Sequence, residues 1–275
     1  MIVLANDGIT GPGKEMLEEA GFEVRNLRVA PEQLANYINN EQVSVLLVRS
    51  ATRVDKDLIT SCPGLLLVGR AGVGLDNIDA TALKKKGVHL INTPKASAES
   101  VAELVFAHLL GGARFLHQAN REMPLEGESQ FRSLKKAYST GRELRGKKLG
   151  VVGFGSIGQA VTKRALAWGM EVGYCDPGKP ETSLELSFAG GQAIGIGLKH
   201  ADLKTLLASS DFVSLHTPAQ EDYLIGKKEL GLMKKGGALI NTARGGLVDE
   251  AALLEALDTG HLSFAALDVF EAEPA

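Results

Sequence analysis

The stretch VVGFGSIGQAV, residues 151–161, carries three glycines at the spacing G-x-G-x-x-G. Gly153, Gly155 and Gly158 follow an apolar run typical of a strand and begin a stretch typical of a helix, which is the context that a dinucleotide-binding loop requires. In such a loop the first glycine allows a tight turn, the second lets a pyrophosphate approach the backbone, and the third lets the helix pack on the strand. The helix N-terminus adds free N–H groups and partial positive charge. The stretch therefore predicts a nucleotide site.

An acidic residue directly follows the next predicted strand, Glu171–Cys175. Asp176 lies about 20 residues beyond the glycine loop, where a carboxylate can accept hydrogen bonds from an adenosine ribose. Its negative charge disfavours the additional phosphate of NADP, and no arginine follows immediately. The pair of features favours NAD as the cofactor; a glycine turn followed by an ordinary loop aspartate is the alternative interpretation.

Four further stretches combine charged residues or glycines with predicted strand ends. They are VRSATRV (48–54), VGRAGVGLDNID (68–79), NTARGGLVDE (241–250) and ALDVFEAEP (266–274). The glycine-rich second stretch could direct backbone N–H groups at an anion. Because ligands of open α/β sheets bind beyond the carboxyl ends of the strands, all four stretches could line one cleft.

The order of the predicted elements explains why the glycine loop begins past the middle of the chain, at residue 153 of 275. Short β-branched runs alternate with amphipathic stretches up to Pro94, and the alternation restarts at Lys148. The expected strands are 2–4, 22–27, 43–48, 65–68, 88–91, 149–152, 171–175, 212–215, 237–241 and 264–267. The sequence thus predicts an α/β protein with two doubly wound parallel-sheet domains, residues 1–96 and 97–275, the second of which carries the cofactor loop.

A long helix is expected over residues 98–120, with an interruption at Gly111-Gly112. Its apolar residues cover more than one face, so it is either deeply buried or packed against another subunit. The polar stretch 121–146 is expected to be a connection, and the stretch 181–200 fits no confident assignment.

Composition narrows the classes of function. The 275 residues have a formal net charge of -3, which gives no basic field for a nucleic acid. Cys62 and Cys175 lie far apart, which argues against a metal site or a disulfide framework and favours a reducing cytoplasm. The N-terminus does not resemble a signal peptide, and no apolar run approaches the roughly 20 residues of a membrane span.

Taken together, these motifs resemble the D-2-hydroxyacid dehydrogenase family over essentially the whole chain, and within it the phosphoglycerate dehydrogenases. The resemblance implies a flavodoxin-like substrate domain, completed by a returning C-terminal segment, and a Rossmann-type NAD-binding domain. It implies hydride transfer between a D-2-hydroxyacid and the nicotinamide of NAD, with 3-phosphoglycerate and 3-phosphohydroxypyruvate of serine biosynthesis as the preferred pair. A glyoxylate or hydroxypyruvate type of 2-oxoacid reductase and a non-catalytic NAD(H)-sensing protein are the alternatives.

The resemblance also implies roles for individual residues. Arg244 would clamp the carboxylate and carbonyl of the 2-oxoacid, and Glu273 would raise the pKa of a catalytic imidazole. The substrate-binding residues would be Arg49, Ser50, Gly72, Val73, Gly74 and Arg244. The NAD-binding residues would be Val73, Gly153, Gly155, Ser156, Ile157, Gly158, Asp176, His216, Thr217, Pro218, Thr242, Ala243, Arg244 and Asp268. A surface ion-pair arginine is the alternative for Arg244, and an ordinary strand-end arginine is the alternative for Arg49.

One expected residue has no match in the sequence. The family's catalytic histidine would follow about 20 residues after Glu273, past residue 275, so we expect the native polypeptide to continue. His216, within SLHTP, matches a cofactor-side motif, and His108 is expected to be packed in a core. The resemblance further implies a homo-oligomer, a dimer or tetramer, built on the helix over residues 98–116, with no metal, nucleic-acid or membrane partner.

Overall fold

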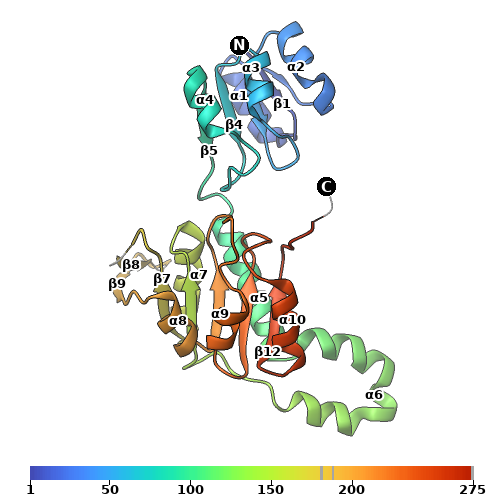
Figure 1. Ribbon diagram of the computed structural model, residues 1–275, viewed down its shortest axis with the longest axis vertical. Coiled ribbons are helices and arrows are strands. Elements are labelled where there is room, and N and C mark those ends of the chain that lie inside the picture. The colour runs from blue at the N-terminus through green and yellow to red at the C-terminus, as the bar shows by residue number, and fades with distance from the viewer. Residues whose placement is uncertain (180–181, 188, 274–275) are drawn as a thin grey trace. The chain divides into compact units, whose positions relative to one another are not determined.

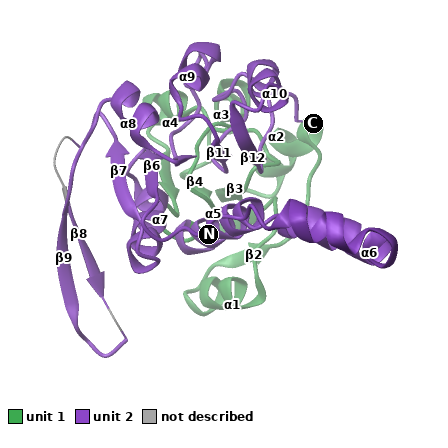
Figure 2. Cartoon of the chain, turned by 90° about the horizontal axis from the view of Figure 1, so that it is seen from below, with its two compact units in different colours: residues 1–97 green, residues 98–275 purple. Residues whose placement is uncertain are grey.

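The computed structural model describes residues 1–179, 182–187 and 189–273, and its chain forms two compact units (Figures 1 and 2). Unit 1 comprises residues 1–97 and unit 2 comprises residues 98–275. Each unit has its own sheet and its own apolar core. Glu181 and Pro274, at the ends of two stretches named above, lie outside the described residues.

Unit 1 is a five-stranded parallel sheet with strand order β2-β1-β3-β4-β5. Its strands are β1 (Ile2–Ala5), β2 (Glu23–Arg25), β3 (Val43–Val48), β4 (Leu67–Arg70) and β5 (His89–Asn92). Its helices are α1 (Gly11–Glu19), α2 (Pro31–Asn40), α3 (Lys56–Ser61) and α4 (Ala80–Lys86). This is the flavodoxin-like order, in which a ligand site is expected where neighbouring loops leave the sheet in opposite directions.

Local sequence signals set the helix ends of unit 1. Pro31 opens α2, and the carboxylate of Asp55 accepts a hydrogen bond from the backbone N–H of Leu58, 3.0 Å away, to cap α3. Asp79 caps α4 in the same way. Gly87 ends α4 in the left-handed conformation, with φ 73°, which costs glycine little.

Unit 2 contains a second five-stranded parallel sheet, with strand order β12-β11-β10-β6-β7. Its strands are β6 (Lys148–Val152), β7 (Glu171–Cys175), β10 (Phe212–Leu215), β11 (Gly237–Asn241) and β12 (Leu262–Leu267). Its helices are α5 (Ala98–Ala113), α6 (Leu116–Tyr138), α7 (Ser156–Ala167), α8 (Leu203–Ser209), α9 (Lys227–Leu232) and α10 (Glu250–Asp258). A parallel bridge between Tyr174 and His200 continues the sheet beyond β7. The two parallel sheets confirm the predicted fold class.

The long predicted helix differs from expectation at its centre. The Gly111-Gly112 pair does not interrupt α5, which runs through it. A Cβ on Gly112 would lie 2.3 Å from the ring of Phe264, so this glycine allows α5 to approach β12 closely. The helix breaks instead at Phe115, whose φ is 57°. Val105 and Leu109 are fully buried in the core of unit 2, so the apolar surface of α5 is largely used within its own unit.

The predicted connection over residues 121–146 was wrong, because residues 116–138 are helical. Gln130 has non-helical backbone angles, and the chain turns back there, so α6 runs out from the unit and returns (Figure 1). At its base the rings of Phe115 and Tyr138 are 6.0 Å apart, and the Tyr138 hydroxyl donates a hydrogen bond to the Glu122 carboxylate. These long-range contacts explain why a polar, proline-containing stretch folds as a helical pair. No helix among the described residues is both long enough and apolar enough to cross a bilayer.

The segment that had no assignment forms an antiparallel hairpin, β8 (Thr182–Ser187) and β9 (Ala193–Leu198). Leu184 pairs with Ile196, and Leu186 pairs with Ile194, so the four apolar residues share one face. Leu184 is 3% exposed and anchors the hairpin to the unit, whereas Ile194, further out, is 55% exposed.

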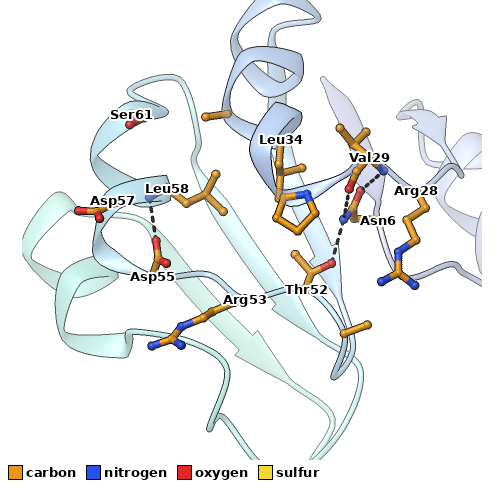
Figure 3. Close-up of a pocket in the computed structure, with 13 residues that line it drawn as sticks. Asn6, Arg28, Val29, Leu34, Thr52, Arg53, Asp55, Asp57, Leu58 and Ser61 are labelled. Atoms are coloured by element: carbon orange, nitrogen blue, oxygen red, sulfur yellow. Dashed lines mark hydrogen bonds between the residues drawn. The ribbon is translucent and has the colours of Figure 1, made fainter. Parts of the chain in front are cut away.

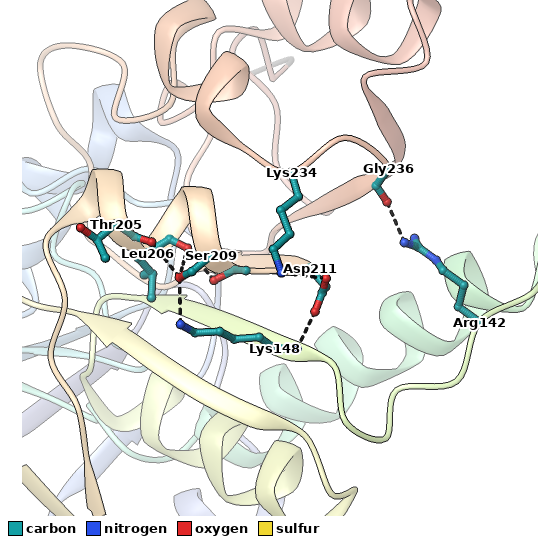
Figure 4. Close-up of polar contacts among 9 residues, drawn as sticks. Arg142, Lys148, Thr205, Leu206, Ser209, Asp211, Lys234 and Gly236 are labelled. Atoms are coloured by element: carbon teal, nitrogen blue, oxygen red, sulfur yellow. Dashed lines mark hydrogen bonds and ion pairs between the residues drawn. The ribbon is translucent and has the colours of Figure 1, made fainter.

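The amino edge of the unit 2 sheet is fixed by charged side chains (Figure 4). The Asp211 carboxylate accepts hydrogen bonds from the backbone N–H of Lys148 at 2.8 Å and from the Lys234 ammonium at 3.1 Å. The Arg142 guanidinium donates to the Gly236 carbonyl at 2.7 Å. This edge therefore uses its charges for structure, and the opposite edge carries the candidate site.

Candidate active site

The carboxyl ends of the unit 2 strands form one edge. The register pairs Val152 with Cys175 and Leu215, Leu215 with Asn241, and Asn241 with Leu267, so the residues that follow them lie at the same level of the sheet. The structure therefore brings together the predicted cofactor residues of this unit: Gly153, Gly155, Ser156, Ile157, Gly158, Asp176, His216, Thr217, Pro218, Thr242, Ala243, Arg244 and Asp268.

The three glycines of the loop have different surroundings. Gly153 has φ 91°, and a Cβ there would lie 2.5 Å from the His216 carbonyl oxygen. A Cβ on Gly158 would lie 2.2 Å from the Gly153 carbonyl oxygen. A Cβ on Gly155 would meet nothing within 4 Å. Two of the glycines are thus required by the protein's own packing, and the third leaves space at the start of α7 for a ligand.

Asp176 is bonded to the glycine loop. Its Oδ2 accepts a hydrogen bond from the Phe154 backbone N–H at 2.7 Å, and its Oδ1 accepts one from the Gly178 N–H at 2.9 Å. The Lys179 ammonium donates to the Phe154 carbonyl at 2.8 Å. A carboxylate offers about four acceptor positions, so Asp176 can still accept bonds from two ribose hydroxyls.

Two threonine hydroxyls at this edge are buried without a partner. The Oγ1 atoms of Thr217 and Thr242 make no hydrogen bond to any described residue. Such groups are costly to leave unsatisfied, so they mark positions where a polar ligand atom belongs. Together with the open space at Gly155 and the free N–H groups of α7, they fit a bound dinucleotide.

His216 lies between β10 and the glycine loop. Its Nε2 is 2.9 Å from the Ser214 hydroxyl, and burial lowers the pKa of the imidazole to about 3. At neutral pH the ring is therefore uncharged and a weak proton acceptor. Its assignment to the cofactor side stays a prediction.

The turn after β11 sets the backbone of Arg244. The Asn241 side-chain amide donates to the Arg244 carbonyl at 2.8 Å, and its carbonyl accepts from the Ala243 N–H at 3.0 Å. The Arg244 guanidinium donates to the Ala243 carbonyl at 2.6 Å. Asn241 is 1% exposed, so a buried amide holds the turn that carries the predicted substrate clamp.

The loops after β11 and β12 touch. A Cβ on Gly245 would lie 1.9 Å from the Phe270 carbonyl oxygen, so only glycine permits this approach. The Glu273 carboxylate accepts a hydrogen bond from the Phe270 N–H at 3.0 Å and is otherwise exposed. Arg244 and Glu273 thus lie on two loops in direct contact within unit 2.

The backbone groups of the glycine turn of unit 1, residues 72–74, point in directions that hydrogen bonds fix. The Thr93 N–H donates to the Gly72 carbonyl at 3.3 Å, and the Asn92 side-chain amide donates to the Val73 carbonyl at 3.0 Å. Because the peptide unit is planar and trans, the N–H groups of Val73 and Gly74 point the opposite way from these carbonyls. No described residue accepts a hydrogen bond from either N–H. The turn therefore presents two free donors, as a carboxylate site requires.

Two cavities lie at the carboxyl edge of the unit 1 sheet. One, of about 520 Å³, lies between α2 and α3; it is lined by Leu34 and Leu58 and by the arginines 28 and 53 (Figure 3). The other, of about 530 Å³, is lined by Asp7, Gly8, Asn26, Arg49, Ser50 and Ala51, among others. The second cavity holds the predicted substrate residues Arg49 and Ser50. No group of acidic, histidine or cysteine side chains among the described residues could hold a metal ion.

Fold and site together define a dinucleotide-binding oxidoreductase. The family model for the NAD-binding domain of D-isomer specific 2-hydroxyacid dehydrogenases matches residues 106–275. The chain belongs to the D-isomer specific 2-hydroxyacid dehydrogenase family of NAD-dependent enzymes, which confirms the resemblance and the NAD assignment.

Similar proteins span several substrates. The chain is 42% identical to a hydroxypyruvate reductase of Thermotoga maritima over 275 residues, 99% of this chain and 83% of the relative. It is 40% identical to a D-3-phosphoglycerate dehydrogenase of Methanocaldococcus jannaschii over 274 residues, 99% of this chain but only 49% of that relative. The crystal structure of TT0316 protein from Thermus thermophilus superposes with a TM-score of 0.79 at 36% identity, covering 100% of this chain and 84% of that one.

The contacts of several residues near the site could not be predicted from the sequence. Lys179, Asn92 and Asn77 act through hydrogen bonds to backbone carbonyls 19 to 28 residues away. The polar residue at each position was visible, but the backbone atom that it contacts was not.

Proposed function

We propose that the protein is an NAD-dependent oxidoreductase that interconverts a D-2-hydroxyacid bearing a distal anionic group and its 2-oxoacid, with 3-phosphoglycerate and 3-phosphohydroxypyruvate as the preferred pair. Such a reaction would serve serine biosynthesis. NAD, when bound, supplies the nicotinamide that accepts the hydride from C2 of the hydroxyacid.

The arginine in the second cavity carries this proposal. The Arg49 guanidinium and the Ser50 hydroxyl are exposed and have no hydrogen bond or ion pair within the described part of the chain. A guanidinium with free donors suits a phosphate because its planar fork makes two parallel bonds. Neither glyoxylate nor hydroxypyruvate offers a group of that charge.

The remaining groups would handle the reacting end of the substrate. The N–H groups of Val73 and Gly74 would bind the carboxylate, and Arg244 would clamp the carboxylate and the carbonyl. Glu273 would hydrogen-bond the imidazole that moves the hydroxyl proton and would keep the pKa of that imidazole near neutral. We do not assign that role to His216, because burial lowers the pKa of its imidazole to about 3, which makes it a weak proton acceptor near neutral pH.

Steady-state kinetics test the substrate assignment. Purified protein would be assayed with NADH and, in parallel, 3-phosphohydroxypyruvate, hydroxypyruvate and glyoxylate. We expect the highest kcat/KM for the phosphorylated substrate and a selective loss of that preference in Arg49→Ala. Equal use of the three substrates would support a general 2-oxoacid reductase, and tight NADH binding without turnover of any would support a sensing protein.

We also propose a homo-oligomer in a reducing compartment such as the cytoplasm. Leu125 and Phe131 of α6 are 85% and 53% exposed, which is unusual for large apolar side chains on one projecting element. Both cysteines are free, which agrees with a reducing environment. Light scattering coupled to size exclusion tests the first proposal, with Leu125→Asp expected to reduce the mass.

A further inference from the structure

The loop that follows β3 is held from both sides by side chains of other loops. The Asp7 carboxylate accepts hydrogen bonds from the backbone N–H groups of Arg49, at 2.7 Å, and Thr52, at 3.0 Å. The Asn77 amide donates to the carbonyls of the same two residues, at 2.9 and 2.6 Å. An acceptor-only carboxylate and a two-donor amide therefore satisfy the complementary backbone groups at both ends of the loop.

The Thr52 hydroxyl reinforces this arrangement. It donates to Asp7 Oδ1 at 2.6 Å and accepts from the Asn6 amide at 2.8 Å, and both Asn6 and Thr52 are buried (Figure 3). Burial alone would raise the pKa of Asp7, but its hydrogen bonds and the nearby charge of Arg28 lower the pKa below its usual value. Asp7 is thus an anion throughout the neutral range.

The middle of the loop is left without protein partners. Among the described residues, nothing bonds to the backbone N–H groups of Ser50 and Ala51, to the Ser50 hydroxyl or to the Arg49 guanidinium. All of these donors border the 530 Å³ cavity. The network therefore fixes the two ends of the loop and reserves its central donors for a ligand.

Asn77 also joins this loop to the glycine turn. It lies three residues after Gly74, and its backbone carbonyl accepts from the Val54 N–H at 2.8 Å. The two free N–H groups of the glycine turn and the free donors of the Arg49 loop therefore belong to segments of unit 1 that one hydrogen-bond network connects. A substrate with an anion at each end could use both.

We propose that Asn77 and Asp7 are positioning residues for substrate selection: they hold the Arg49–Thr52 loop in the conformation that binds the distal anionic group of the 2-hydroxyacid. This inference rests on the proposed function, because it takes Arg49 as the residue that contacts that group. It assigns specificity to two residues that act through the loop: Asp7 borders the cavity but its carboxylate is bonded by the N–H groups of the loop, and Asn77 does not line the cavity.

The test compares two ligands that differ only in the distal group. Dissociation constants of 3-phosphoglycerate and D-glycerate would be measured calorimetrically on NAD-saturated protein. In Asn77→Ala we expect the affinity for 3-phosphoglycerate to fall about 10-fold or more and that for D-glycerate to change less than about 3-fold. Asn39→Ala is the matched control, because the Asn39 amide makes a similar bond, to the Ser61 carbonyl at 2.8 Å, away from the loop. It should leave both affinities unchanged.

A second variant distinguishes a change in the loop from a general loss of folded protein. Asp7→Asn keeps the size of the side chain but removes the charge, and it should produce the same selective loss. Both affinities come from one preparation, so a partly unfolded sample lowers the active fraction without changing their ratio. Equal weakening of both ligands in Asn77→Ala and Asp7→Asn, or no effect on either, would overturn the inference.

Arg49→Ala separates this inference from the proposed function. If that variant loses discrimination between the two ligands while Asn77→Ala and Asp7→Asn retain it, Arg49 binds the phosphate and the positioning role is wrong. If Arg49→Ala itself retains discrimination, the proposed phosphate site is wrong.

Discussion

The carboxylate of Asp176 accepts a hydrogen bond from the backbone N–H of Phe154, 2.7 Å away, and so holds the glycine loop from the neighbouring strand. The acidic residue that was expected only to face a ribose is also part of the loop's own structure. We therefore propose that Asp176 supports cofactor binding in two ways, and this proposal has a measurable consequence.

Asp176→Asn should weaken NAD binding about 10- to 100-fold, because it removes a charged acceptor worth roughly 1.5–3 kcal/mol from the loop and from the ribose. Affinity for NADP should fall less, since the negative charge that repels its phosphate is also lost. Fluorescence titration with NADH and NADPH measures both. Asp249→Asn, which makes the same chemical change at the cap of α10, should alter neither. An unchanged NADH affinity in Asp176→Asn would contradict the assignment.

Substitutions of Gly158 and Gly155 in the glycine loop should affect protein stability and NAD binding differently. In Gly158→Ala the new methyl group meets the Gly153 carbonyl, so we expect a loss of about 1–3 kcal/mol in unfolding free energy. In Gly155→Ala the methyl group meets no protein atom, so Tm should stay unchanged while NAD affinity falls about 10-fold or more. Thermal melts and NADH titration of the two variants provide the comparison. A destabilised Gly155→Ala with normal NADH binding would rule out this interpretation.

His216 should make the protein sensitive to mild acid. Its pKa is about 3 in the folded chain and about 6.5 when exposed, so between these values the unfolded state binds more protons than the native state. The contribution of His216 to the free energy of unfolding is therefore fully present above pH 6.5. It is lost as the pH falls toward 3, by up to about 1.4 kcal/mol for each pH unit well below 6.5. His216→Gln should flatten the fall in Tm between pH 7 and pH 5. His117→Gln, at an exposed position on α6, should leave the profile unchanged.

The base of α6 should contain one tyrosine that resists ionisation. The hydrogen bond to Glu122 raises the pKa of Tyr138 to about 12, so this hydroxyl should ionise about two pH units above an ordinary tyrosine. Spectrophotometric titration of wild type and Tyr138→Phe identifies its contribution among the four tyrosines. In Glu122→Gln the same group should titrate closer to its usual value of about 10. A titration curve that Glu122→Gln does not shift would show that the contact is absent in solution.

Most of the fold followed from periodicity and turn chemistry. The apolar run of β3 was expected at the bounds that the structure gives it, and Pro31 marked the start of α2. Those signals are local, since they depend on residues within one turn or one strand. The same local reasoning failed for α6, whose polar composition concealed a helix that is closed by contacts of Tyr138 with residues 16 and 23 positions earlier.

By itself, the sequence determined the two α/β units, the glycine loop and its acidic partner, and the identity of the residues at the strand ends. Only the tertiary structure decided what those residues contact: that Asp176 bonds to Phe154, that Asn241 holds the turn of Arg244, and that Asp7 and Asn77 hold the Arg49 loop. The physical reason is distance along the chain. Glycine, proline and capping residues act on neighbouring backbone, whereas Asp7 and Arg49 are 42 residues apart and meet only because β1 and β3 pair in the same sheet.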